Sequence, residues 1–229
     1  RSGDLRAVVS GDWISDMRTG AQPTIACKYL AASTHVVTII GTGRQAYASL
    51  LCMSTRLDIR EVRLCDIRPA ARQRFMSLFP NAPFNMVECQ SNEEACRGSD
   101  VIITVTNADA RLVEEPWVKK GALVLTMGSF TETSDDVVLK ADRLIADHIG
   151  QSLHRGNIAS MAHRGLVDEA SFAAELPRIV AGTQVGREHA DERITCQLVG
   201  MGAPDAAVAA LLIEKMQNAG VEIPTFELT

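Results

Sequence analysis

The most informative residues of this sequence are two glycines separated by one residue, with an alanine three residues later, because this spacing is typical of a turn that binds a ligand. They lie in Gly41-Thr-Gly-Arg-Gln-Ala46, between a β-branched apolar run and an apolar helical stretch. Gly41 can adopt the backbone angles of a tight strand-to-helix turn, Gly43 lets the main chain approach a ligand, and Ala46 permits close helix packing. Amides at the start of a helix bind anions such as a pyrophosphate. The turn therefore predicts a dinucleotide-binding site.

An acidic residue, Asp66, follows the next predicted strand. A carboxylate in this place accepts hydrogen bonds from the hydroxyls of an adenosine ribose and repels a 2′-phosphate, which favours NAD as the cofactor. Arg68 and Arg72 come shortly after it, and a guanidinium there could pair with a 2′-phosphate, so NADP stays possible. Both arginines could equally be solvated residues on the exposed face of a helix.

The composition of the 229-residue chain excludes several classes of partner. A net charge of −5 argues against nucleic acid and anionic membranes, and favours a small-molecule ligand. No apolar run approaches the ~20 residues that span a bilayer. Six scattered cysteines form no CxxC pair and no zinc-ligand spacing, so no metal site is predicted. Their use as small buried apolar residues indicates a reducing, cytoplasmic compartment.

Short β-rich runs alternate with helical patterns from about residue 34 to residue 147. This alternation predicts an α/β fold, a Rossmann-like doubly wound parallel sheet with helices on both faces. The expected strands are Val36–Ile40, Glu61–Cys65, Asn85–Glu88, Val101–Val105, Ala122–Thr126 and Arg143–Ala146. The expected helices are 46–53, 69–78 with Pro69 in its first turn, and a short helix capped by Ser91 with Glu94 three residues later.

The flanking segments do not continue this alternation, and we expect them to belong to a second, incomplete domain for substrate binding and dimerisation. The elements predicted there are a strand at Leu5–Val9, a turn at Gly11–Asp12, a helix at 19–32 with Pro23 in its early turns, and an amphipathic helix at 203–218 with Pro204 as its first residue. The expected division is residues 1–33 as a remnant of that domain, 34–200 as the nucleotide-binding domain, and 201–229 as a helix and tail returning to the second domain.

Several motifs together resemble one family. They are Asp16–Ala21, Ser99–Thr106, Gly121–Ser129, Ala141–Asp147, Gly156 and Val199–Asp205. In their order and spacing around the glycine turn they resemble the ornithine cyclodeaminase/μ-crystallin family of NAD(P)-binding proteins, over essentially the whole chain. The resemblance implies a homodimeric enzyme of amino-acid metabolism. It also implies an N-terminal segment, with part of the substrate platform, that we expect to be missing from this sequence.

The resemblance implies roles for individual residues. Arg18 matches the arginine that binds the substrate carboxylate, a role suited to a planar guanidinium, although it could also be a surface residue at a helix end. Asp147 matches a frequent family acid and is the second catalytic candidate. Strand ends at the ligand-binding edge of the sheet add further candidates. The residues expected to contact the cofactor are Thr19, Gly41, Thr42, Gly43, Arg44, Gln45, Ala46, Asp66, Arg68, Thr104, Thr106, Asn107, Met127, Gly128 and Ser129.

Phe130 departs from the family pattern. Cyclodeaminases carry at the matching position an aspartate that handles the substrate amine, and a phenyl ring cannot accept a proton, so cyclodeamination of ornithine is disfavoured. Glu132 is close enough in sequence to substitute, but its simpler interpretation is a favourable charge at the start of a helix. His148 beside Asp147 is not expected to form a dyad with it, because adjacent strand residues point to opposite faces.

The leading hypothesis is an NAD(P)-dependent oxidoreductase that acts on a carbon–nitrogen bond of an amino or imino acid, as a ketimine reductase or amino-acid dehydrogenase does. One alternative is an ornithine cyclodeaminase-type lyase that reuses its bound NAD. The other is a non-enzymatic, crystallin-like protein that only binds the cofactor. Phe130 argues against the lyase, but the glycine turn does not exclude the binding protein, because binding and turnover share that feature.

Overall fold

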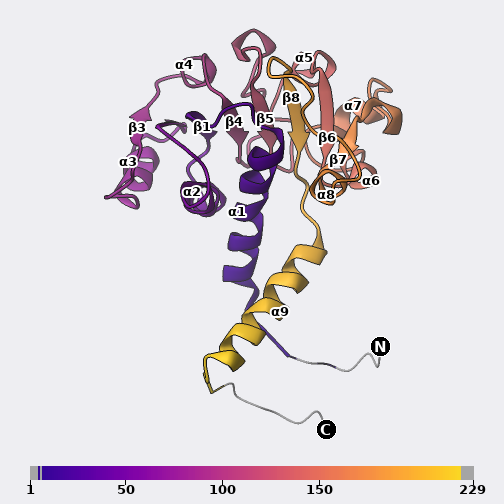
Figure 1. The fold of residues 1–229 in the computed structure, drawn as a ribbon. Coiled ribbons are helices and arrows are strands. Elements are labelled where there is room, and N and C mark those ends of the chain that lie inside the picture. Colours follow the sequence, from indigo (N-terminus) through magenta and orange to yellow (C-terminus); the bar gives the residue numbers. More distant parts are fainter. Residues whose placement is uncertain (1–4, 6, 223–229) are drawn as a thin grey trace.

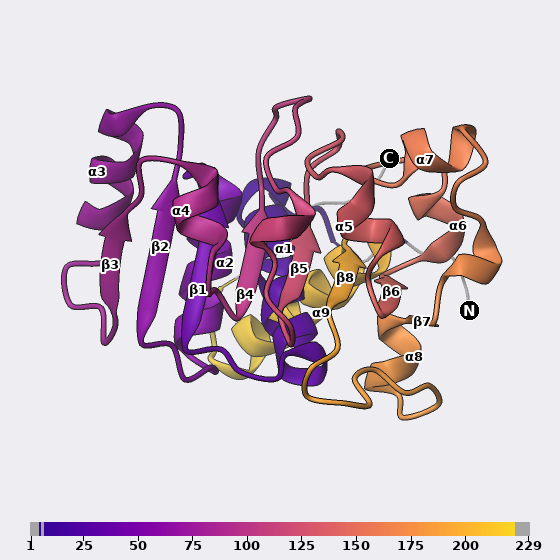
Figure 2. The same ribbon diagram turned by 90° about the horizontal axis from the view of Figure 1, so that it is seen from above.

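A parallel sheet of eight strands forms the centre of the computed structural model, which describes residues 5 and 7–222. The strands are β1 (Val36–Ile40), β2 (Glu61–Cys65), β3 (Asn85–Glu88), β4 (Val101–Thr104), β5 (Leu123–Thr126), β6 (Arg143–Ala146), β7 (Ala174–Glu175) and β8 (Ile194–Gln197). Their order is β3-β2-β1-β4-β5-β8-β6-β7, with β2 and β3 on one side of β1 and β4 and β5 on the other (Figure 2). The predicted doubly wound, Rossmann-like fold is confirmed.

Helices pack on both faces of the sheet (Figure 1). The helices of the described residues are α1 (Gly11–Leu30), α2 (Arg44–Ser54), α3 (Pro69–Ser77), α4 (Asn92–Cys96), α5 (Asp135–Leu139), α6 (Ile149–Ser152), α7 (Ala159–His163), α8 (Leu176–Val180) and α9 (Gly202–Asn218), with short 3₁₀ turns at Glu115–Trp117 and Glu169–Ser171. All but α9 and the N-terminal half of α1 belong to the body around the sheet. Within the described ranges, no helix combines the length and apolar character needed to cross a bilayer.

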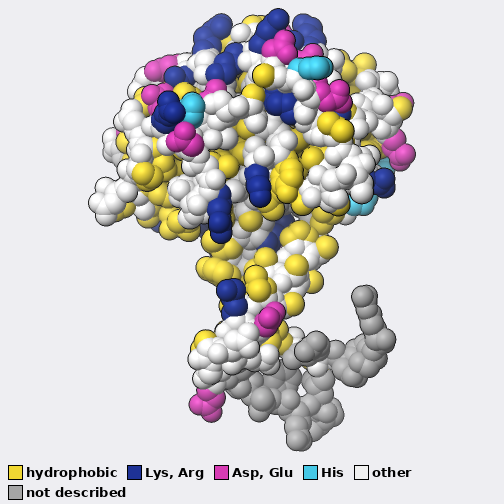
Figure 3. Space-filling view, in the orientation of Figure 1, with side chains coloured by type: hydrophobic (Ala, Val, Ile, Leu, Met, Phe, Trp, Pro, Cys, Tyr) yellow, Lys and Arg dark blue, Asp and Glu magenta, His cyan; other side chains and the backbone are white. Residues whose placement is uncertain are grey.

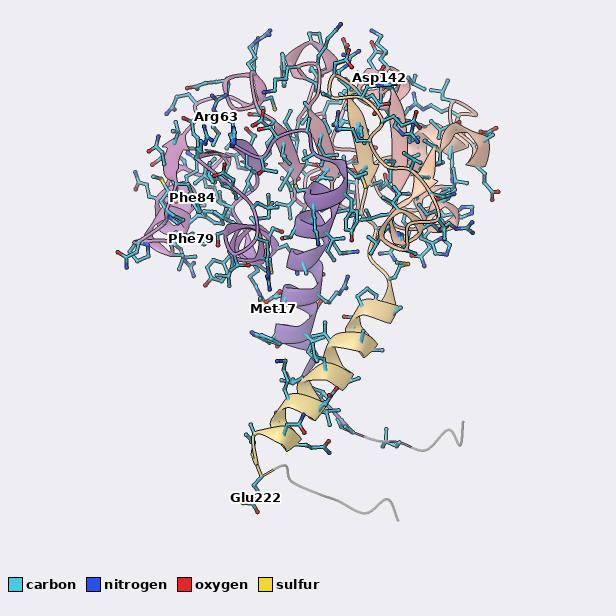
Figure 4. The ribbon with its side chains drawn as sticks, viewed as in Figure 1. Met17, Arg63, Phe79, Phe84, Asp142 and Glu222 are labelled. Atoms are coloured by element: carbon cyan, nitrogen blue, oxygen red, sulfur yellow. The ribbon has the colours of Figure 1, made fainter. Side chains whose placement is uncertain are left out.

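Alternating strand residues explain why each face has its own core. In β1, Val37 and Ile39 join a large apolar cluster with α1, α2, α3 and α8, whereas Ile40 joins a smaller cluster on the opposite face. Tyr47, Phe79 and Phe84 close the β3 side of the large cluster, and the rings of Phe79 and Phe84 lie 6.5 Å apart (Figure 4). Because both faces are covered, the central strands β1, β4 and β5 are nearly continuous apolar runs.

Three predictions for the N-terminal flank are wrong. Leu5 and residues 7–9 form no strand, residue 6 lies outside the described residues, and Gly11 and Asp12 are the first turn of α1. Asp12 suits that position because a carboxylate stabilises the positive end of a helix. The predicted helix 19–32 is therefore only the second half of α1, and Pro23 lies in its interior instead of its early turns.

The C-terminal helix also differs from its prediction. Pro204 is the third residue of α9, where the missing N–H costs nothing because the first four amides of a helix have no intrahelical partner. No residue of α9 is fully buried, but half-buried residues recur at helical spacing, among them Val208, Leu212 and Met216, and the helix contacts α1, so its predicted amphipathic face is only partly covered. The helix leaves the body beside the N-terminal half of α1, and apolar side chains lie along the stem that the two helices form (Figures 1 and 3).

The second half of α1 packs closely against α2, and Gly20 makes this possible. A Cβ at Gly20 would lie 2.4 Å from the carbonyl carbon of Ala48, closer than any side chain allows. The helix is thereby held against the start of α2, next to the glycine turn. Met17 marks the part of α1 that leaves the body, one residue before Arg18 (Figure 4).

Candidate functional site

The glycine turn joins β1 to α2 and leaves the start of the helix open. Gly41 has φ +98°, and a Cβ there would lie 2.7 Å from the carbonyl oxygen of Val105, so only glycine fits. A Cβ at Gly43 would meet nothing within 4 Å, and no side chain caps α2. Ala46 is fully buried. The first amides of α2 are therefore available to an anion.

Two open cavities meet at this turn. The first, of about 530 Å³, reaches the ends of β4 and β5, where Thr106, Asn107 and Met127–Ser129 line it. The second, of about 670 Å³, lies toward α3 and is lined by Thr42 and Arg68, among others. Both include Gly43 and Arg44. Two chambers joined at a helix N-terminus fit two nucleosides linked by a pyrophosphate.

Asp66 holds the glycine turn in place, and its partners Thr42 and Arg68 line the second cavity. Its Oδ2 accepts hydrogen bonds from Thr42 N at 3.0 Å and Thr42 Oγ1 at 2.9 Å, and its Oδ1 accepts one from Arg68 N at 3.0 Å. Burial by itself would raise the pKa of Asp66, but these hydrogen bonds from Arg68 and Thr42 lower it below the ordinary value. The carboxylate is therefore charged at neutral pH.

The two arginines after Asp66 lie in different environments. Arg68 is exposed, and its Nε lies 3.6 Å from Asp66 Oδ1. Arg72 is buried: its Nε donates to Glu88 Oε2 at 3.1 Å and its Nη1 donates to the carbonyl oxygen of Asp66. Arg72 is therefore not a solvated residue, and it does not line the second cavity, where a 2′-phosphate would lie.

Glu132 is the residue of this region that the sequence interpretation placed wrongly. It is fully buried, and α5 begins only at Asp135, so Glu132 is not a helix charge. Its Oε1 accepts hydrogen bonds from Thr106 N and Oγ1, and its Oε2 accepts them from Thr104 Oγ1 and Gly128 N, all between 2.7 and 3.0 Å. One carboxylate thus ties the loop after β4 to the loop after β5.

This contact changes the role expected for two neighbours. Thr104 is fully buried and its hydroxyl donates a hydrogen bond to Glu132, so it lies behind the wall of the first cavity and not in its lining. A Cβ at Gly128 would lie 2.4 Å from the carboxyl carbon of Glu132, which explains the glycine there. The only sequence signal for Glu132 was its place just after the fifth strand, within a polar run typical of a surface loop.

Arg18 and Asp147 lie in one polar cluster between α1, β6 and the loop before α9. Arg18 Nε donates to Asp205 Oδ1 at 3.0 Å, and a Cβ at Gly200 would lie 2.9 Å from Arg18 Nη1. Asp147 accepts from the amides of Val199 at 3.1 Å and Gly200 at 2.7 Å. The Asp147 carboxylate thereby shapes the loop against which Arg18 rests.

Burial raises the pKa of Asp147 above its ordinary value, although the hydrogen bonds from Gly200 and Val199 oppose this. Gln22 on α1 also donates to it, at 3.3 Å. The neighbouring His148 is exposed and caps α6, where its Nδ1 accepts from Gln151 N at 3.3 Å. Asp147 thus binds the loop before α9 whereas His148 caps α6, and the two side chains form no dyad, as expected.

Three buried side-chain oxygens around the first cavity have no hydrogen-bond partner among the described residues. They belong to Thr19 on α1, Gln45 on α2 and Thr126 at the end of β5. Other residues of α1 and α2, and the loop after β5, line that cavity. Unpaired buried polar atoms are costly, and Gln45 is the one of the three that lines the cavity, so its side chain is placed to meet a polar ligand there.

Comparison with known proteins identifies the family. A model described as the ornithine cyclodeaminase/mu-crystallin family matches residues 1–220. The chain belongs to this family. The alanine dehydrogenase of Archaeoglobus fulgidus is 30% identical over 228 residues, which are 97% of this chain and 70% of that protein. The relatives thus extend beyond the matched region, and the family resemblance predicted from the motifs is confirmed.

Solved structures of the family agree with the fold. A Thermococcus litoralis Delta(1)-pyrroline-2-carboxylate reductase in complex with NADH and L-proline superposes with a TM-score of 0.91 at 30% identity, over 98% of this chain and 71% of that one. An archaeal alanine dehydrogenase dimer with bound NAD gives a TM-score of 0.89 at 31% identity, over 98% and 72% of the two chains.

Proposed function

We propose that this chain binds NAD(H) across the two cavities and serves an oxidoreductase that moves a hydride to or from a carbon–nitrogen bond of an amino or imino acid. The observation that carries the proposal is the uncapped start of α2, placed between two cavities by a turn in which only glycine fits at Gly41. Relatives whose names or solved complexes include NAD, NADH, alanine and proline support the reaction class.

The adenosine half of the cofactor belongs in the cavity beside Asp66. Three protein hydrogen bonds already use that carboxylate, which leaves about one of its four acceptor sites for a ribose hydroxyl. Its negative charge disfavours a 2′-phosphate, so NAD is the preferred cofactor. Arg68 is exposed on the rim of the same cavity and leaves weaker binding of NADP open.

The nicotinamide half belongs in the cavity between α1 and the ends of β4 and β5. When bound there, the cofactor supplies the hydride chemistry, and the chain's own residues position the reactants. Glu132 fixes Thr106 and Gly128 in the wall of this cavity. Arg18 is proposed to bind the substrate carboxylate, in competition with Asp205, and Asp147 is proposed to hold the loop beneath Arg18.

The lyase alternative is weakened by the loop after β5. Phe130 is 46% exposed and has no ionisable group, and Glu132, which could have replaced the missing aspartate, is buried and already accepts four hydrogen bonds. Neither side chain is therefore free to take a proton from a substrate amine. This favours plain hydride transfer over cyclodeamination.

Two further proposals concern the assembly and its compartment. The apolar helix α9 has no fully buried residue and projects from the body beside α1, which supports the assignment of residues 1–33 and 201–229 to a second domain and to a homodimer. The archaeal alanine dehydrogenase dimer supports it too. The six cysteines are all free and five are buried, which fits a reducing, cytoplasmic location.

A substrate screen tests the proposed function. NADH oxidation is followed with pyruvate plus ammonia and with Δ1-pyrroline-2-carboxylate, and NAD reduction with alanine and proline. Turnover of at least one pair, lost in Arg18→Ala with NADH binding retained, is the expected result. Ornithine consumption without net NADH change would favour the lyase, and NADH binding without turnover of any substrate would favour the binding protein.

A further inference from the structure

Asp16 lies where the two cavities meet and holds the side chains of both residues that follow Gly43. Its Oδ2 accepts hydrogen bonds from Arg44 Nη2 at 2.6 Å and Nε at 3.1 Å, and its Oδ1 accepts one from Gln45 Nε2 at 3.1 Å. Asp16 and Arg44 line both cavities. Since each cavity takes one half of a dinucleotide in the proposed function, the group at their junction is the pyrophosphate.

The atoms of Arg44 that Asp16 occupies are those that bind a phosphate best. A guanidinium offers Nε and Nη2 as a paired fork, and Asp16 uses both. The start of α2 attracts anions, whereas a carboxylate at the same point repels a pyrophosphate. The competing charges of Asp16 and of a ligand phosphate therefore act on the same donors.

The ion pair is weak enough to be exchanged. The side chain of Arg44 is 70% exposed and that of Asp16 25%, so solvent screens their attraction. Gln45 Nε2 also donates to Asp16, so a phosphate that displaces the carboxylate frees this donor together with those of Arg44. A bound nucleotide can thus replace Asp16 at small cost, but the carboxylate remains beside it.

We propose that Asp16 is a built-in competitor for the cofactor pyrophosphate, an inference that rests on the proposed dinucleotide site. In the free protein Asp16 binds Arg44 and Gln45, and in the complex these side chains turn to the pyrophosphate. The competition weakens cofactor binding and speeds release. Fast release suits an oxidoreductase that exchanges reduced for oxidised nucleotide in every cycle, because product release often limits such enzymes.

Calorimetric titration of NADH against the whole chain and its Asp16→Asn variant tests this proposal, with stopped-flow measurement of NADH release. Asparagine keeps the shape and removes the charge, so the dissociation constant should fall about three- to tenfold, and release should slow in proportion. Asp191→Asn is the matched control for net charge: Asp191 is exposed in the loop before β8 and lines neither cavity. Its effect should stay below about twofold.

Each other result overturns the proposal in a recognisable way. Unchanged or weaker NADH binding in Asp16→Asn would show that Asp16 does not compete. An equal gain in Asp191→Asn would assign the effect to net charge. Arg44→Gln should weaken binding, and unchanged affinity would show that Arg44 never reaches the pyrophosphate. Failure of the unmodified chain itself to bind NADH would instead overturn the proposed function on which this inference rests.

Discussion

Replacing Glu132 by glutamine tests whether one buried carboxylate organises the nicotinamide side of the site. Both side chains have nearly the same shape, so the change alters hydrogen bonding and charge without leaving a cavity. Glu132 Oε1 faces Thr106 N and Oε2 faces Gly128 N. Whichever oxygen becomes the NH₂ group of glutamine, it meets a backbone N–H, and two donors then face each other.

The cost follows from the contacts that are lost. One backbone hydrogen bond to a charged group disappears and one buried amide loses its partner, while the hydroxyls of Thr104 and Thr106 can rotate and accept from the new NH₂. Removing a buried charge offsets part of the loss. We expect a net destabilisation of about 2 kcal/mol. In a chain of this size that lowers Tm by roughly 4 to 8 °C.

Thermal unfolding followed by circular dichroism measures the stability, and NADH titration measures the site. Because Thr106 and Gly128 line the first cavity, the dissociation constant for NADH should rise severalfold as well. Glu169→Gln, at an exposed position, serves as the control and should change neither quantity. Unchanged Tm and unchanged NADH affinity in Glu132→Gln would refute the clamp that the four hydrogen bonds describe.

Three further predictions concern the glycine turn, Asp66 and Asp147. Gly41→Ala should destabilise the fold by at least ~1–2 kcal/mol, because φ is +98° and the new Cβ meets a carbonyl oxygen. Gly43→Ala should leave Tm unchanged and weaken NADH binding about tenfold or more, because its Cβ points into open space beside the bound pyrophosphate. Equal effects of the two variants on Tm would contradict this difference. Asp66→Ala should weaken NADH binding severalfold and bring the dissociation constants for NADH and NADPH closer together, which parallel calorimetric titrations measure. An unchanged ratio of the two constants would contradict the role of Asp66 in binding the ribose. The pKa of Asp147 is raised in the folded chain, so its contribution to stability falls as pH rises from the unfolded pKa through the folded one. Denaturant unfolding at several pH values should therefore show the free energy of unfolding of the unmodified chain falling, relative to that of Asp147→Asn, as pH rises through this range; a constant difference would contradict this.

The sheet was predictable because its strands are β-branched, buried on both faces and separated by clear turns. The predicted bounds of β1, β2, β3 and β6 match, and those of β4 and β5 differ by one residue at one end. β8 was missed, since Ile194–Gln197 carries two polar residues in four, although all four are buried between β5 and β6. The two-residue β7 has too little sequence to show any period.

The site was predictable where chemistry depends on local spacing. The glycine turn and Asp66 are close in sequence, and their geometry follows from a strand-turn-helix unit. Contacts between distant segments gave no such signal. Asp16 meets Arg44 only because Gly20 lets α1 approach α2, and Glu132 meets Thr106 only because β4 and β5 are neighbours in the sheet. A polar residue that serves such a contact looks like a surface residue in the sequence.

A crystal structure of the chain with NADH tests the central claim most directly. The account predicts the pyrophosphate within hydrogen-bonding distance of the amides of residues 43–46, with the adenosine beside Asp66 and the nicotinamide between α1 and the ends of β4 and β5. A nucleotide bound anywhere else, or an α2 N-terminus that stays empty while NADH binds, would contradict it.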